Sequence, residues 1–177
     1  MKSIFAFLFF VTFLNAKVVP LEEMIPQMIM VGFDGVKAGD KWVEQIVKDI
    51  KREKISGVFL TEKNIHNSTQ LKKLNHYLKS QTPKNGLPIF IALSHEGGES
   101  VLSTQKGFKN IPNANAMASK KDIDEAKALY LGLSSDLQDC EINLNFAPTL
   151  ELSDKQSRSF SKLEEVTTAY ATSFIDS

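Results

Sequence analysis

The sequence has a single cysteine, Cys140, so no disulfide can form within one chain. Its place late in a helical pattern predicts a small buried hydrophobe rather than a reactive thiol. Acidic and basic residues balance at 21 each, and no run of one sign occurs. We therefore expect neither nucleic acid nor an anionic membrane surface as a partner. Without a Pro- or Ser-rich linker, the chain is expected to form one domain.

Motifs that would hold nucleotides or metals are also missing. No Gly-x-Gly-x-x-Gly follows the first apolar run, and no phosphate loop occurs in the sequence. His95-Glu96 lacks the second histidine of a zinc-binding helix, and the glycines after it disfavour a helix. Ser94 and His95 are neighbours on an extended segment, so their side chains should point to opposite faces and form no nucleophile–base pair. We expect no cofactor and no metal site.

Residues 1–16 have the pattern of a secretory signal peptide. Lys2 provides the positive start, residues 4–14 form an apolar run, and Ala16 offers a small residue before the cut. The run is shorter than the roughly 20 residues that a membrane-spanning helix needs. The sequence therefore predicts an exported protein, periplasmic or secreted, that keeps no membrane segment after cleavage.

Strand-like and helix-like segments alternate through residues 17–177. Short apolar runs predict strands at residues 28–33, 57–60, 87–93 and 142–147. The third run is continuous, which is typical of a strand buried on both faces. Four strands, each followed by a helix, predict an α/β fold with parallel strands. Periodicity alone leaves open a doubly wound sheet or a (β/α) barrel.

Amphipathic patterns predict the four helices and where each begins. The first covers residues 40–54 and includes Trp42 in its apolar stripe. The second begins at a Ser68 cap and stops before Pro83. Ser119 and Ser161 are expected to cap the third and fourth, each with an acidic residue three positions on.

The third strand leads into Ser94-His95-Glu96-Gly97-Gly98-Glu99. Polar groups after a buried parallel strand, beside glycines that let a ligand approach the backbone, are typical of α/β binding sites. A simple turn at the two glycines is the alternative.

Further motifs follow in order along the chain: Ile111-Pro112, Asn143-Leu144-Asn145-Phe146-Ala147-Pro148, and Arg158-Ser159-Phe160. Together with Glu96-Gly97-Gly98 they resemble the N-terminal barrel of glycoside hydrolase family 3, and most of all its bacterial β-N-acetylhexosaminidases. The resemblance runs from about Met24 to the last residue. It implies that residues 17–177 form the first half of a TIM-type (β/α)8 barrel.

The resemblance implies that Arg158, Glu96 and Ser94 bind a carbohydrate of the N-acetylglucosaminide type. The family has an arginine in the same Arg-Ser-Phe context, and its fixed donors suit a polyhydroxylated ligand. The chain departs from the family at Ser94, where an aspartate is usual, and at Glu99, where an arginine is usual. Both exchanges alter hydrogen-bonding capacity, and the second reverses the charge.

The family's Lys-His-Phe-Pro-Gly-His-Gly segment and later nucleophilic aspartate do not occur in this sequence. Four carboxylates lie at or just past the predicted strand ends: Asp34, Glu62, Glu96 and Glu151. Because polar residues are common at strand ends in any α/β domain, we assign none of the four a catalytic role. We expect a truncated glycoside hydrolase, inactive as this fragment, related to enzymes that cleave O-glycosyl bonds of amino sugars in cell-wall or glycan fragments. The alternative is a non-catalytic or vestigial carbohydrate-binding half-barrel.

A half-barrel would leave two sheet edges unpaired and its interior face uncovered. We expect the side chains on that face to be exposed to solvent, namely Val31, Phe59, Phe90 and Ile91, or their neighbours. Self-association through the open edges is therefore a further expectation.

Overall fold

The computed structural model describes residues 19–100 and 102–177, so the expected signal peptide lies outside the described residues. One four-stranded sheet has the order β1-β2-β3-β4 with every pair parallel. Its strands are β1 (Met30–Gly32), β2 (Gly57–Phe59), β3 (Phe90–Leu93) and β4 (Leu144–Asn145). The strands follow chain order without reversal, as in a (β/α) barrel and unlike a doubly wound sheet. The expected parallel α/β fold is confirmed.

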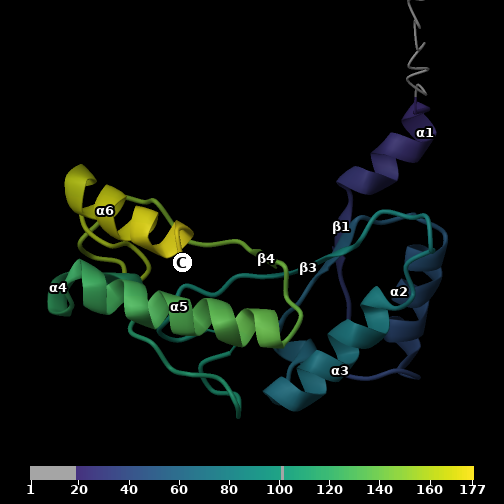
Figure 1. Cartoon of the computed structure of the whole chain (residues 1–177), viewed down its shortest axis with the longest axis horizontal. Coiled ribbons are helices and arrows are strands. Elements are labelled where there is room, and N and C mark those ends of the chain that lie inside the picture. Colours follow the sequence, from purple (N-terminus) through teal and green to yellow (C-terminus); the bar gives the residue numbers. More distant parts are fainter. Residues whose placement is uncertain (1–18, 101) are drawn as a thin grey trace, which may run out of the picture.

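Helices connect the strands and lie mainly on one side of the sheet (Figure 1). They are α1 (Leu21–Met24), the 3-10 turn η1 (Ile25–Met28), α2 (Lys41–Lys51), the 3-10 turn η2 (Glu62–Asn64), α3 (Ser68–Lys79), α4 (Ala114–Lys120), α5 (Ile123–Asp139) and α6 (Glu164–Ile175). Within the described ranges, no helix has both the length and the apolar character that crossing a bilayer requires.

The core lies between the sheet and these helices. Residues paired across parallel strands share a face, and Val58 and Ile91 are paired and fully buried. Apolar side chains at helical spacing on α2 and α3 complete this core: Val43, Ile46, Val47, Ile50, Leu71, Leu74 and Leu78. Cys140 is also buried, as expected, and burial raises the pKa of its thiol to about 11.

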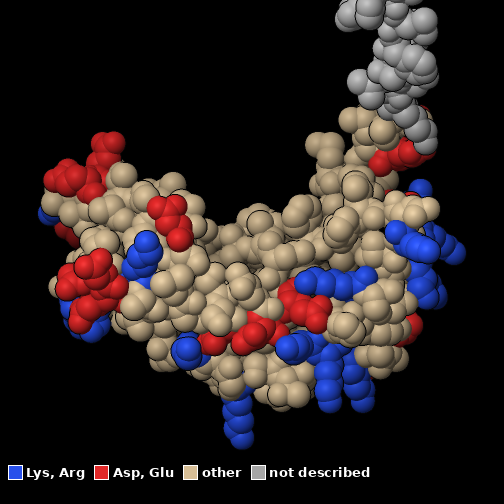
Figure 2. Space-filling model, in the orientation of Figure 1, with Lys and Arg blue, Asp and Glu red and all other residues tan. Residues whose placement is uncertain are grey.

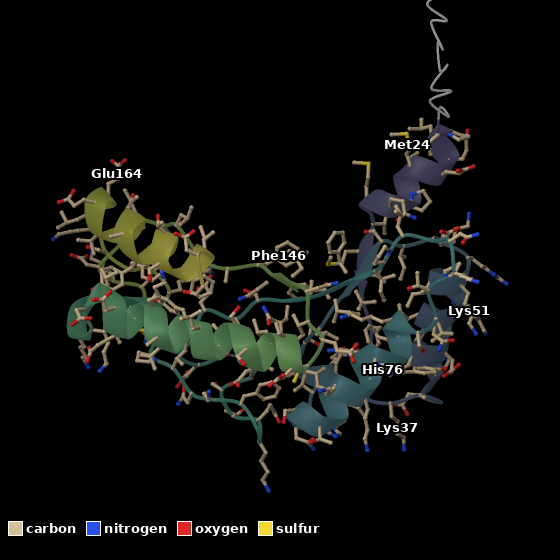
Figure 3. All side chains as sticks on the ribbon, in the orientation of Figure 1. Met24, Lys37, Lys51, His76, Phe146 and Glu164 are labelled. Atoms are coloured by element: carbon tan, nitrogen blue, oxygen red, sulfur yellow. The ribbon has the colours of Figure 1, made fainter. Side chains whose placement is uncertain are left out.

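The opposite face of the sheet is open. Phe90 and Phe146 are 47% and 53% exposed, and the rings of Phe59 and Phe146 lie 5.8 Å apart. Phe146 projects from the side of the sheet away from α3 and α5 (Figure 3), above a concave surface that carries few charges (Figure 2). The expectation of a wet interior face is thus correct for Phe90 but wrong for Ile91 and Val31, which share the covered face with Val58.

The expectation that residues 87–93 are buried on both faces is correct for Ile89, Ile91, Ala92 and Leu93, but wrong for Leu87 and Phe90. Leu87 is 65% exposed, and Phe90 lies on the open face. A continuous apolar run is also compatible with a strand that has one exposed face. The run alone therefore could not distinguish such a strand from one that is buried on both faces.

Three predicted helix starts are shifted. Asn67 rather than Ser68 caps α3, because its side-chain oxygen accepts the Gln70 amide hydrogen at 2.9 Å. Asp122 rather than Ser119 caps α5, since the chain turns between Lys120 and Ile123. The expected capping box at Ser161 is not formed, because α6 begins at Glu164 and Ser161 binds the amide of Leu163. The side chain of Trp42 lies 52% exposed beneath the Lys41 ammonium, outside the buried stripe.

Candidate functional site

A pocket of about 570 Å³ lies where the chain leaves the C-terminal end of β3. It is lined by Ser94, Glu96, Gly97, Glu99, Ser100, Asn113, Ala114, Ser157 and Arg158. The three residues predicted to bind substrate, Arg158, Glu96 and Ser94, therefore line one pocket. Its place at the carboxyl ends of parallel strands is the usual position of sites in (β/α) barrels.

Thr149 joins two of these residues. Its hydroxyl donates to Oε1 of Glu96, and its oxygen accepts hydrogen bonds from Nε and Nη2 of Arg158 at 3.3 and 2.8 Å. The loops after β3 and β4 are thus linked across the pocket wall. Glu96 and Arg158 belong to motifs in the sequence, whereas Thr149 carries no signal of its own beyond its place directly after Ala147-Pro148.

The remaining predicted residue, Ser94, is held by the neighbouring strand. Its hydroxyl donates to the backbone oxygen of Phe146 at 3.1 Å, which leaves the lone pairs of the serine available to accept from a ligand. A serine in this position offers fewer acceptor sites than a carboxylate would.

The two glycines shape the pocket by allowing close backbone contact. Gly97 has φ +84°, and a Cβ there would lie 2.3 Å from the backbone oxygen of Pro112. Gly98 has φ +63°, and its amide donates to the oxygen of Ile111 at 2.8 Å. Only glycine fits this packing, which brings Asn113 against the loop and into the pocket wall.

Asn143 and Asn145 fix the end of β3 through their side chains. The Asn145 amide group accepts from the backbone nitrogen of His95 at 2.9 Å and donates to its oxygen at 3.0 Å. Asn143 makes the same kind of paired contact with Ile91 and Ile89. The side chains of Asn143 and Asn145 therefore extend the hydrogen bonding between β3 and the two-residue strand β4, and so position the residues that follow His95.

The other strand-end carboxylates are absent from the pocket lining. Asp34 forms an exposed ion pair with Lys63 at 3.1 Å, and Glu151 accepts from Gln156 at 3.0 Å. Glu62 is exposed in η2. No cluster of three His, Cys, Asp or Glu side chains suitable for a metal ion occurs among residues 19–100 and 102–177.

Ser94 and His95 point to opposite sides, as expected. Ser94 is exposed in the pocket, whereas His95 is 2% exposed on the covered side of the sheet. Burial lowers the pKa of His95 to about 4, and the weaker influence of the Asp136 carboxylate acts in the opposite direction. His95 is therefore a neutral imidazole at neutral pH.

Parallel strands in barrel order, with a polar pocket at their carboxyl ends, define a partial (β/α) barrel. The chain belongs to glycosyl hydrolase family 3, whose N terminal domain matches residues 20–177. A beta-hexosaminidase of Bordetella avium (strain 197N) is 28% identical over 121 residues, covering 65% of this chain and 34% of the relative. One of Neisseria meningitidis serogroup A is 35% identical over 106 residues, covering 55% and 28%. The chain thus spans about a third of the length of these relatives.

Solved structures agree on the fold. A family 3 beta-N-acetylglucosaminidase from Paenibacillus sp. str. FPU-7 superposes with a TM-score of 0.77 at 24% identity, covering 90% of this chain and 31% of that one. NagZ from Neisseria gonorrhoeae, in complex with N-trifluoroacetyl-D-glucosamine, superposes with a TM-score of 0.68 at 25% identity. That match covers 82% of this chain and 45% of NagZ.

Proposed function

We propose that this chain is the sugar-binding half of a β-N-acetylhexosaminidase-type barrel. Its ligand is an amino sugar of the N-acetylglucosaminide type from a cell-wall or glycan fragment, bound in the pocket that Glu96 and Arg158 line. The 177-residue polypeptide binds this sugar weakly and does not hydrolyse it.

The observation that carries this proposal is the hydrogen-bonded array in which Thr149 links Glu96 to Arg158, two residues that line the same pocket. A saccharide hydroxyl both donates and accepts, so a sugar site needs acceptors and donors close together. Glu96 and Ser94 provide acceptors, and the guanidinium of Arg158 retains further N–H groups. The relatives' names and the sugar derivative in the NagZ complex support the same class of ligand.

The proposed lack of turnover rests on the chemistry that glycoside cleavage requires. A proton donor and a nucleophile or base must flank the anomeric carbon. By the family resemblance, these roles belong to the Lys-His-Phe-Pro-Gly-His-Gly segment and the later aspartate, which do not occur in this sequence. Glu96 is engaged with Thr149, and the nearby Glu99 is exposed to solvent. We therefore expect the 177-residue polypeptide by itself to bind the sugar without hydrolysing it.

Two assays on the purified 177-residue protein test the proposal. We expect no release of chromophore from a chromogenic N-acetyl-β-glucosaminide above a buffer blank. We also expect N-acetylglucosamine to shift NMR resonances of pocket residues, with the shifts lost in Arg158→Ala. Arg52→Ala is the matched control, because Arg52 is the only other arginine and lies exposed at the end of α2.

Two results would contradict the proposal. Turnover that survives Arg158→Ala but disappears in Glu96→Gln would make the strand-end carboxylates a catalytic set. No resonance shift in the unaltered protein at any sugar concentration would leave a vestigial scaffold without a sugar site.

A further inference from the structure

A buried histidine lies directly behind the pocket wall. The Nδ1 atom of His95 is 2.5 Å from Oγ of Ser100, and Ser100 lines the pocket. His95 is 2% exposed, and its Nε2 atom is buried without a hydrogen-bond partner among the described residues. The two residues thus connect the covered side of the sheet to the ligand side.

The unpartnered Nε2 decides which ring nitrogen carries the proton. A neutral imidazole has one N–H, and a buried N–H without a partner is among the rarest arrangements in proteins. Placing the hydrogen on Nδ1 lets His95 donate to Ser100 and leaves a bare nitrogen at Nε2. The opposite tautomer would strand a donor in the apolar interior.

This tautomer determines what the Ser100 hydroxyl can offer. Its oxygen accepts from His95 Nδ1 and, at 3.4 Å, weakly from the amide of Leu102. Both acceptor positions are then occupied, so the hydroxyl hydrogen is directed elsewhere. Because Ser100 is only partly buried and lines the pocket, the open direction is toward a ligand.

The pair is unsuited to nucleophilic catalysis. A serine nucleophile needs a histidine that takes its proton and a third group that orients that histidine. Here the Nδ1 atom donates to the serine, and the Nε2 atom has no orienting carboxylate among the described residues. The geometry therefore supports a fixed hydrogen-bond donor.

We propose that Ser100 is a sugar-binding residue that donates its hydroxyl hydrogen to a neutral oxygen of the ligand, and that His95 is the positioning residue that fixes this direction. The inference rests on the proposed sugar-binding function and adds a specific contact to it. A neutral oxygen is favoured because the pocket lining holds two carboxylates, Glu96 and Glu99, against the single guanidinium of Arg158. An anionic group would be repelled by this excess of negative charge.

The tautomer is tested by long-range nitrogen–proton NMR of the histidine rings in the unaltered protein. The chain has three histidines, and His95→Asn identifies the resonances of His95. We expect a protonated Nδ1 and a bare Nε2 in His95. A proton on Nε2 would overturn the proposal whatever the stability of any variant.

The ligand contact is tested with Ser100→Ala and a set of N-acetylglucosamine analogues that each lack one oxygen. We expect Ser100→Ala to weaken N-acetylglucosamine binding by about 3- to 10-fold, as for the loss of one neutral hydrogen bond. That loss should vanish for the one analogue that lacks the accepting oxygen, because the serine and the oxygen form a double-mutant cycle. Ser135→Ala, at an exposed position of α5, should leave affinity unchanged.

The results separate this inference from the proposed function. Sugar binding that Ser100→Ala does not weaken, or weakens equally for all analogues, overturns the role of Ser100 and leaves the sugar site standing. Absence of binding in the unaltered protein overturns both.

Discussion

Thr149 donates its hydroxyl hydrogen to Glu96 across the gap between the loops that follow β4 and β3. The same oxygen accepts two hydrogen bonds from the guanidinium group of Arg158, so an uncharged side chain couples a carboxylate to a cation. Both charged groups consequently have a hydrogen-bonded position in the pocket, while Arg158 as a whole remains exposed.

Replacing Thr149 with valine keeps the shape of the side chain and removes the hydroxyl. Glu96 and Arg158 then lose their shared partner, and we expect N-acetylglucosamine binding to weaken by about 10-fold or more, as for the loss of hydrogen bonds to charged groups. NMR titration of the 177-residue protein measures this. Thr149→Ser restores the hydroxyl and should bind within about twofold of the original protein, whereas equal affinity in Thr149→Val would remove Thr149 from the site.

Gly97→Ala should destabilise the fold strongly. Its φ of +84° disfavours a side chain, and the new Cβ would lie 2.3 Å from a backbone oxygen that cannot move aside easily. Gly39→Ala is the matched control, because Gly39 has φ +88° with nothing within 4 Å of the new atom. We expect about 1 kcal/mol of destabilisation at Gly39 and at least about 2 kcal/mol more at Gly97, measured by urea unfolding. Equal losses would show that the loop accommodates the new atom.

Acid should destabilise the protein through His95. Its pKa is lowered to about 4 in the folded state, against about 6.5 in an unfolded chain. Between these values the unfolded state binds more protons, so stability is present above about pH 6.5 and falls as the pH drops toward 4. Once the pH lies below both pKa values, the free energy of unfolding is lower by on the order of 3 kcal/mol.

Urea unfolding at pH 7 and pH 5 measures this dependence. His95→Asn, which cannot take up the proton, should show a smaller difference between the two pH values. His76→Asn provides the control, since His76 is exposed and bonds to Glu141 at 2.9 Å. An unchanged pH dependence in His95→Asn would contradict the assignment.

The open face of the sheet should cause self-association of the 177-residue protein. Phe90 and Phe146 are about half exposed there, and β1 and β4 have unpaired outer edges among the described residues. Sedimentation should show dimers or larger species, reduced in a Phe90→Thr/Phe146→Thr double variant. Trp42→Thr removes an equally exposed aromatic from the outer surface of α2 and should have little effect. A monodisperse monomer with a sharp, cooperative melt would contradict this prediction.

Export is expected to remove residues 1–16. Intact-mass measurement of protein from the periplasmic or secreted fraction should give a mature N-terminus at Lys17, because the small Ala16 precedes the cut. Replacing Ala16 with a bulky residue should retain the longer form, whereas Ala38→Leu should be processed normally. Soluble protein that keeps Met1 in the cytoplasm would rule out the signal peptide.

The four strand–helix units and their order were predictable from the sequence. Short apolar runs and helical stripes such as Leu71, Leu74 and Leu78 are local properties, and a parallel sheet follows from their alternation. The family resemblance also pointed to Arg158, Glu96 and Ser94, and the structure brings the three into one pocket, while their role in sugar binding stays a prediction. Helix starts were less predictable, because Ser68 and Asn67 are both good caps and only the backbone path selects one.

Contacts between distant segments were decided by the tertiary structure alone. Thr149 lies 53 residues from Glu96 along the chain, and only the adjacency of β3 and β4 brings its hydroxyl to that carboxylate. The burial of His95 is a second example. The sequence predicts that the side chains of Ser94 and His95 point to opposite sides, but only the packing decides which of them is exposed to solvent. Sequence periodicity specifies which residues share a face, whereas the partner of that face depends on contacts that close only when the chain folds.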